Sequence, residues 1–289
     1  MIFIALSVVC SVVVSVLLKL APRCGVDVRQ AITGNYLVAT LLTVLLLDPR
    51  PSLLELPAAH PAWRVLVALG VLLPAMFVVL AYSVRRVGVV LTDAAQRLSL
   101  LLPLVAAFTL FGEAFSWHKG IGMGIGLAAI ACIVTRKRAG AAGAAGAGGW
   151  GWPLAVFAGM GAIDILFKRV AQLTGVPFAD VLLATFVLAF ALAMLATVWL
   201  FASGRAQWHW RNAAGALLLG VFNFGNILFY VQAHRHLAQD PALVFSAMNI
   251  GVIVLAALVG VLWLGERLGR LNRAGLALAV AAVLVLATA

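Results

Sequence analysis

The chain of 289 residues is 65% hydrophobic and only 10% charged, with a mean hydropathy of +1.14. A soluble domain carries roughly 45–50% apolar and about 25% charged residues, so the composition excludes an ordinary soluble protein. The net charge of +11 does not indicate nucleic acid, because the basic residues form small clusters at predicted helix ends, as topology determinants do. We therefore expect a lipid bilayer and no nucleic acid as the partner. The three cysteines have no disulfide or metal-ligand spacing, and we expect no metal or cofactor.

Ten apolar runs follow one another along the chain, each long enough to predict a transmembrane helix. Backbone groups in lipid must be satisfied within their own segment, so runs of this length should be helical. The predicted fold class is all-α, a polytopic, multi-pass membrane protein with ten transmembrane helices. The runs cover approximately residues 1–21, 30–48, 64–84, 87–111, 118–135, 151–172, 179–202, 213–233, 241–263 and 271–288.

A tract of alanine and glycine, residues 139–149, separates the first five runs from the last five and reads as a flexible tether. We therefore divide the chain into a first half, 1–138, a linker, 139–150, and a second half, 151–289. Because each half has an odd number of helices, the halves should insert with opposite orientations, which gives an inverted repeat.

The halves also repeat short motifs. Gly112-Glu113 returns as Gly265-Glu266, 153 residues later, and Lys19 returns as Lys168. Membrane proteins with internal repeats usually place a substrate path at the repeat interface, so this duplication favours a transporter.

The pattern along the two halves resembles a known family. A polar fourth run with Pro103 leads to the Gly112-Glu113 turn and a glycine-rich fifth run, and the second half repeats this tail from Asn249 to Gly275. It is similar to the EamA-type branch of the drug/metabolite transporter superfamily over essentially the whole chain. The resemblance implies a ten-helix inner-membrane carrier, not an enzyme, with two inverted five-helix repeats around a central cavity. It also implies cytoplasmic termini, whereas the excess of Lys and Arg in the odd-numbered loops places both termini outside.

Two acidic residues, Asp93 and Asp164, fall well inside predicted helices, and each has a basic residue four positions later, Arg97 and Lys168. Such partners lie one turn apart on one helical face. A lone charge at the centre of a membrane helix costs at least about 2.5–3.5 kcal/mol, so the pairs should face the bundle interior. They either hold helices together or line a hydrated pathway. Lys168 is near its helix end, where it could also extend to the membrane interface.

Asp164 is the predicted proton-coupling residue, because its counterpart in the first half is Ser15 and a directional step could use that asymmetry. Further polar side chains extend the candidate substrate site. Asn223, Asn226 and Tyr230 share one stripe by their three-and-four spacing. Interhelical hydrogen bonding is an equally open interpretation for them. The predicted substrate-binding residues are Arg97, Asp93, Gln96, Lys168, Asn223, Asn226, Tyr230 and Asn249.

Other notable residues are predicted to be structural. Glu113 and Glu266 lie near predicted helix ends, beside Lys119 and beside Arg267 and Arg270. The glycine pairs Gly120/Gly124 and Gly122/Gly126 should allow another helix to approach closely. Prolines inside the apolar runs should bend or start helices. The histidines, including His234, are placed in loops.

The function predicted from these residues is secondary transport of a small polar metabolite by a monomer or homodimer. The interior charges of Lys19, Arg97 and Lys168 against Asp93 and Asp164 sum to +1, which favours an anionic or zwitterionic substrate. The alternative is a flippase for a lipid or lipid-linked phosphate, with Arg97 binding the phosphate.

Overall fold

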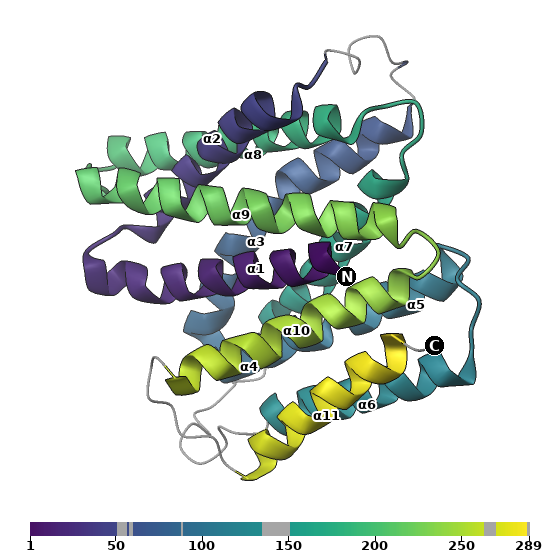
Figure 1. Cartoon of the computed structure of the whole chain (residues 1–289). Coiled ribbons are helices and arrows are strands. Elements are labelled where there is room, and N and C mark those ends of the chain that lie inside the picture. Colours follow the sequence, from purple (N-terminus) through teal and green to yellow (C-terminus); the bar gives the residue numbers. More distant parts are fainter. Residues whose placement is uncertain (51–56, 58–59, 88, 135–150, 263–269, 288–289) are drawn as a thin grey trace. The chain divides into compact units, whose positions relative to one another are not determined.

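The computed structural model describes residues 1–50, 57, 60–87, 89–134, 151–262 and 270–287. Within these ranges the chain forms eleven α-helices and one short 3-10 helix, and no strand (Figure 1). The all-α prediction is confirmed for this part of the chain. The helices are α1 (Ile2–Leu20), η1 (Ala21–Cys24), α2 (Val28–Leu47), α3 (Pro61–Val87), α4 (Val89–Leu98), α5 (Leu101–Thr109), α6 (Trp117–Val134), α7 (Gly151–Gln172), α8 (Phe178–Ala202), α9 (Trp210–His236), α10 (Pro241–Leu262) and α11 (Arg270–Ala287).

Each predicted apolar run coincides with helical structure, but the fourth run, 87–111, is not a single helix. It is divided into α4 and α5 by a turn at Ser99 and Leu100. Pro103 explains the break, because its nitrogen cannot donate to the carbonyl four residues earlier and its ring clashes with that carbonyl, which belongs to Ser99. The Ser99 carbonyl instead accepts from the N–H of Leu102 at 3.0 Å.

Six of the described helices are long and apolar enough to cross a membrane. The chain is therefore a polytopic membrane protein, and the count of ten spans stays a prediction. The six spans are Ile2–Cys24, Val28–Leu47, Pro61–Val84, Phe178–Ala202, Trp210–His236 and Pro241–Val259.

The chain divides into two compact units, and each takes segments from both halves of the sequence. Unit 1 consists of Met1–Val8, Met76–Ile165 and His236–Ala289, and unit 2 of Val9–Ala75 and Leu166–Arg235. Helices α1, α3 and α7 each contribute one part to each unit.

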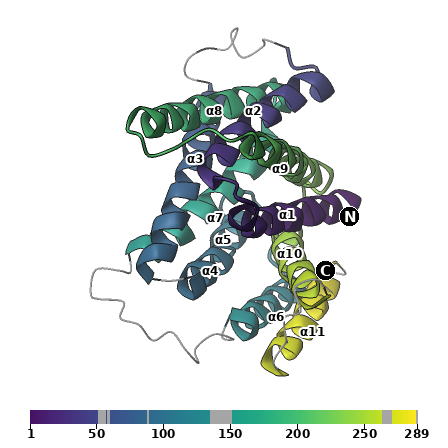
Figure 2. The same cartoon turned by 90° about the vertical axis from the view of Figure 1, so that its left-hand side faces the viewer.

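In unit 2, α2 and α8 lie side by side in both views (Figures 1 and 2). Near the start of α2, the hydroxyls of Thr33 and Thr197 hydrogen-bond at 2.7 Å. Beyond its other end, the N–H of Arg50 donates to Asp180 in the first turn of α8 at 2.8 Å. The start of each helix thus meets the end of the other, so the pair is antiparallel. The two helices occupy the same position in their respective halves.

In unit 1, α6 and α11 form the corresponding close pair (Figure 2). A Cβ added at Gly122 would lie 2.7 Å from Leu286, and one at Gly126 would lie 3.0 Å from Ile250 of α10 and 3.7 Å from Ala282. The chain positions run in opposite directions, so α6 and α11 are antiparallel as well. The predicted role of Gly122 and Gly126 in close helix packing is confirmed.

The same prediction is wrong for Gly120 and Gly124. A Cβ at Gly124 would meet no described atom within 4 Å, and one at Gly120 would meet only the ring of Phe115 within that distance. Both glycine pairs have the same spacing, but they lie on different faces of α6, and only one of those faces contacts α11.

Candidate functional site

The residues predicted for the site divide between the two units. Asp93, Gln96, Arg97, Asp164 and Asn249 fall in unit 1. The other four, Lys168, Asn223, Asn226 and Tyr230, fall in unit 2. Asp164 and Lys168 are one turn apart on α7, at the point where that helix passes from one unit to the other.

Lys168 is the most buried charged residue that the structure describes, with 0% of its surface exposed. Its Nζ points to the backbone carbonyl of His234 on α9 at 3.5 Å, which is the long end of the range for a hydrogen bond. That carbonyl belongs to the last turn of α9, where the helix dipole favours a cation. The expected extension of Lys168 to the membrane interface is wrong, because the side chain points into the bundle of unit 2.

Buried aromatic residues lie beside this lysine: Phe167 precedes it on α7, and His234 provides the carbonyl that its Nζ approaches. The ring of Tyr230 lies edge-on to Phe167, with centroids 6.1 Å apart, and edge-on to His234 at 4.8 Å. All three rings are buried. We call Phe167, Lys168, Tyr230 and His234 the Lys168 cluster.

His234 was missed by the sequence prediction, which placed it in a loop. Helix α9 continues to His236, and the imidazole of His234 is 1% exposed. A signal was available in the sequence, because positions 223, 226, 230 and 234 continue one helical stripe. The predicted run ends at residue 233, three residues before the end of α9.

The polar stripe of α9 becomes more buried toward its C-terminal end. Asn223 and Asn226 are half-buried, whereas Tyr230 is buried. Phe224, between the two asparagines in the sequence, packs against Phe186 of α8 with ring centroids 6.5 Å apart. The stripe therefore leads from a partly accessible face of α9 to the Lys168 cluster.

In unit 1, Asp93, Gln96 and Arg97 lie on α4, before the break between α4 and α5. The other two predicted residues lie on α7 (Asp164) and on α10 (Asn249). Gln96 and Arg97 are half-buried, and the carbonyl of Gln96 accepts from the Ser99 hydroxyl at 2.7 Å. The side chain of Asp93 lies outside the described part of the chain. Asn249 donates to the carbonyl of Phe245 in its own helix at 3.1 Å, so part of its amide is used within α10.

Glu113 is structural, as predicted. The Lys119 ammonium donates to Glu113 at 2.7 Å and to Asp240 at 2.9 Å. The second oxygen of Glu113 accepts from the N–H of Ala242 at 2.7 Å, which caps the start of α10. The glutamate that the Gly-Glu motif contributes thus joins the α5–α6 turn to another helix of unit 1. Its counterpart Glu266 lies outside the described residues.

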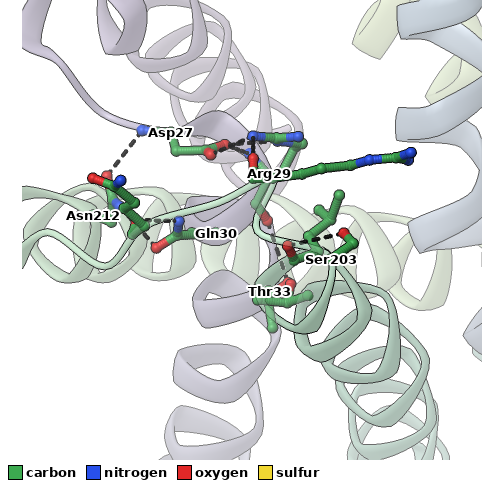
Figure 3. Close-up of polar contacts among 10 residues, drawn as sticks. Asp27, Arg29, Gln30, Thr33, Ser203 and Asn212 are labelled. Carbon is green, nitrogen blue, oxygen red and sulfur yellow. Dashed lines mark hydrogen bonds and ion pairs between the residues drawn. The ribbon is translucent and has the colours of Figure 1, made fainter.

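A second polar group ties the start of α2 to α9 (Figure 3). The Asn212 oxygen accepts from the N–H of Asp27 at 2.9 Å, and its amide donates to Gln30 at 2.8 Å. Gln30 in turn donates to the carbonyl of Gln207 at 2.8 Å. We call Asp27, Gln30 and Asn212 the α2–α9 seam. Gln30 and Asn212 are both buried, so their hydrogen bonds satisfy groups that water cannot reach.

Asp27 also begins α2. Its carboxylate accepts from the N–H of Arg29 at 2.9 Å and forms an ion pair with the Arg29 guanidinium at 2.8 Å. Hydrogen bonding to the Arg29 side chain lowers the pKa of Asp27 below its ordinary value. Burial acts in the opposite direction and has the smaller effect.

Among the described residues, no three His, Cys, Asp or Glu side chains gather closely enough to hold a metal ion.

Residues 1–135 match the model of the EamA-like transporter family. A protein of Haemophilus influenzae (strain ATCC 51907 / DSM 11121 / KW20 / Rd), whose description reads "Uncharacterized protein", is 40% identical over 283 residues, which cover 97% of this chain and 95% of that protein. The chain belongs to the EamA-like transporter family. Members of this family are transporters of the drug/metabolite superfamily, not enzymes. A solved structure described as "Crystal structure of protein" has a TM-score of 0.61 at 15% identity and covers 99% of this chain and 98% of its own. At that identity the likeness shows the fold alone.

Proposed function

We propose that this EamA-like transporter is a secondary carrier of the inner membrane that moves a small anionic or zwitterionic metabolite by alternating access. The observation that carries the proposal is the complete burial of Lys168. An ionisable side chain inside a membrane protein is costly, and residues of this kind usually serve a transport path.

The chemistry of the Lys168 cluster fits such a substrate. A lysine ammonium is a compact point charge with three donors, suited to a carboxylate or phosphate. The hydroxyl of Tyr230 and the imidazole of His234 add groups that both donate and accept hydrogen bonds. The stripe of Asn223 and Asn226 supplies neutral amides for the rest of a polar molecule.

Pairing of equivalent helices supports the inverted repeat predicted from the sequence. In both units the close pair joins helices from the same position of the two halves, α2 with α8 and α6 with α11, and both pairs are antiparallel. An in-plane pseudo-two-fold axis between two such helices produces this arrangement. Asp27 and Asp180 fit the same relation, since they begin α2 and α8 and lie 153 residues apart.

The test is a thermal-shift screen of the purified full-length protein in detergent against amino acids, organic acids and sugar phosphates. A ligand at about 100 times its Kd stabilises the native state by about 2.7 kcal/mol. We expect an anionic or zwitterionic ligand to stabilise the wild type and Arg169→Gln but not Lys168→Met. Arg169 is the matched control, because it is the adjacent basic residue and is exposed. A hit that survives Lys168→Met contradicts the assigned role of the cluster.

Proton coupling is tested by measuring uptake of the same ligand into proteoliposomes. We propose that Asp164 carries the proton and that Arg97 binds the substrate. Asp164→Asn should abolish uptake driven by a proton gradient while the protein remains folded, and Arg97→Ala should lose binding. Normal gradient-driven uptake by Asp164→Asn would remove the proton role. If no soluble compound stabilises the protein, and lipid phosphates stabilise it in a way that is lost in Arg97→Ala, the flippase replaces the carrier as the function.

A further inference from the structure

A cavity of about 370 Å³ lies in unit 2, between the end of α1 and the start of α9. It is separate from the Lys168 cluster, and its volume is within the ~300–1,000 Å³ range typical of small-ligand pockets. Its walls are almost entirely apolar. The side chains that matter here are Leu17 and Leu20 of α1, Val26 before α2, and Trp210, Ala214 and Leu218 of α9.

The cavity is accessible from outside the helices that form it. Trp210 is 73% exposed and Leu218 is 50% exposed, and both contribute to its lining. Tryptophan at a helix end is typical of the membrane interface, and a second one, Trp208, precedes the helix. The cavity therefore begins at the level of the interface and continues along the apolar face of α9.

Its length fits the hydrocarbon region of one leaflet. The lining positions on α9 run from Trp210 to Leu219, about 14 Å at a rise of ~1.5 Å per residue. That is about half of the ~30 Å hydrocarbon core of a bilayer. An acyl chain entering at the tryptophan level would reach the end of the cavity near the bilayer midplane.

The open end of the cavity is basic. Arg211 is one of the lining residues, and its guanidinium reaches over the backbone at Gly25, where an added Cβ would lie 3.5 Å away. Lys19 and Arg23 lie in the same end of unit 2, on the segment that lines the other wall. The carboxylate of this segment, Asp27, forms its ion pair with Arg29. The charge at the rim is complementary to an anionic headgroup and not to a cationic one.

We infer that this cavity binds one acyl chain of an anionic phospholipid, with Arg211 holding the phosphate at the rim. The α2–α9 seam supports the site, because Asn212 follows Arg211 on α9 and fixes that end of the helix to Asp27 and Gln30. The site is independent of the proposed transport cycle, since it contains none of the residues assigned to substrate or proton.

The experiment is native mass spectrometry of the full-length protein in detergent with dioleoyl phosphatidylglycerol and, separately, dioleoyl phosphatidylcholine. We expect phosphatidylglycerol to bind more tightly, and Arg211→Gln to reduce its affinity about fivefold, the effect of one basic residue near an anionic lipid. Arg235→Gln, at the opposite end of α9, is the charge control and should change nothing. Glycerol phosphate, the headgroup without chains, should not compete.

A second variant pair tests the cavity itself. Ala214→Phe places a ring in the cavity, whereas Ala213→Phe places the same ring at the neighbouring exposed position, which does not line it. We expect Ala214→Phe to lose phosphatidylglycerol binding and Ala213→Phe to retain it, with matching thermal unfolding temperatures. Equal binding by both variants, equal affinity for the two lipids, or full competition by glycerol phosphate would each overturn the assignment. Because the readout is lipid binding, none of these results depends on transport.

Discussion

The backbone N–H of Ala242 donates a 2.7 Å hydrogen bond to the carboxylate of Glu113, 129 residues earlier in the chain. The first N–H groups of a helix have no partner within the helix, and a carboxylate at that end also interacts favourably with the helix dipole. Glu113 therefore caps α10 from outside it, while Lys119 balances its charge. The Gly-Glu turn joins helices that are far apart in sequence.

Removing this cap should destabilise the protein. Glu113 is buried, and Glu113→Ala leaves the Lys119 ammonium and the Ala242 N–H without that oxygen partner. Deleting one partner of a buried ion pair costs about 3–5 kcal/mol when the remaining charge is left alone. Lys119 keeps its pair with Asp240, so the cost of Glu113→Ala should be smaller than that. We expect a lower thermal unfolding temperature in detergent. Glu113→Gln keeps an acceptor for the Ala242 N–H, so its unfolding temperature should lie between those of the wild type and the alanine variant. Equal stability of all three proteins would show that the cap does not matter.

Helix packing between α6 and α11 should depend on which glycine is changed. Gly122→Leu inserts a side chain where a Cβ alone would lie 2.7 Å from Leu286, and overpacking of this kind costs about 1–3 kcal/mol. Gly124→Leu meets no described atom near its Cβ and removes a helix-destabilising glycine, so it should be neutral or slightly stabilising. The comparison needs only the unfolding temperatures of the two variants. A lower unfolding temperature for Gly124→Leu than for Gly122→Leu would contradict the packing of α6.

The buried hydrogen bond between Asn212 and Gln30 should appear as an interaction energy. Asn212→Leu alone leaves the Gln30 amide oxygen without this donor, at a cost of about 1–3 kcal/mol. Gln30→Met with Asn212→Leu should cost less than the sum of the single changes, with a coupling of about 1 kcal/mol. Additive effects in this double-mutant cycle would mean that the two amides do not stabilise each other.

Asp27 should contribute stability that disappears in acid. Its pKa is lowered in the folded protein from the ordinary 3.8, mainly by hydrogen bonding to Arg29. A carboxylate of this kind stabilises the fold above its unfolded pKa, and the contribution is lost as the pH falls through the lower folded pKa. The carboxylate is partly exposed, so the effect is small. Asp27→Asn should be less stable than the wild type at pH 6, and the difference should shrink below pH ~4. A difference that stays constant with pH would contradict the ion pair.

The sequence was sufficient for those features of the fold that depend on local composition. Helical structure lies in each of the ten apolar runs, and Pro103 marks the position where the fourth run breaks into α4 and α5. The predicted end of α9 at residue 233 is three residues too early, although no glycine or proline follows until Pro241. Boundaries of this kind depend on packing, which a single sequence does not show.

The candidate site was only partly predictable for the same reason. Lys168 was found because a charge inside an apolar run is visible in the sequence, but its burial against α9 is a tertiary property. The contact of Glu113 with Ala242 and the seam between Gln30 and Asn212 join segments more than a hundred residues apart. Neither spacing nor hydrophobic pattern identifies such partners.

The antiparallel pair of α2 and α8 has a mechanical consequence. A hydrogen bond joins the two helices at each end, between Thr33 and Thr197 and between Arg50 and Asp180. Sliding one helix past the other by a single turn, about 5.4 Å, would break both hydrogen bonds together. Shear between these two helices therefore loses both hydrogen bonds at once, about 0.5–1.5 kcal/mol each. A conformational cycle that moves α2 and α8 as one rigid piece, with its hinge elsewhere in the chain, keeps both.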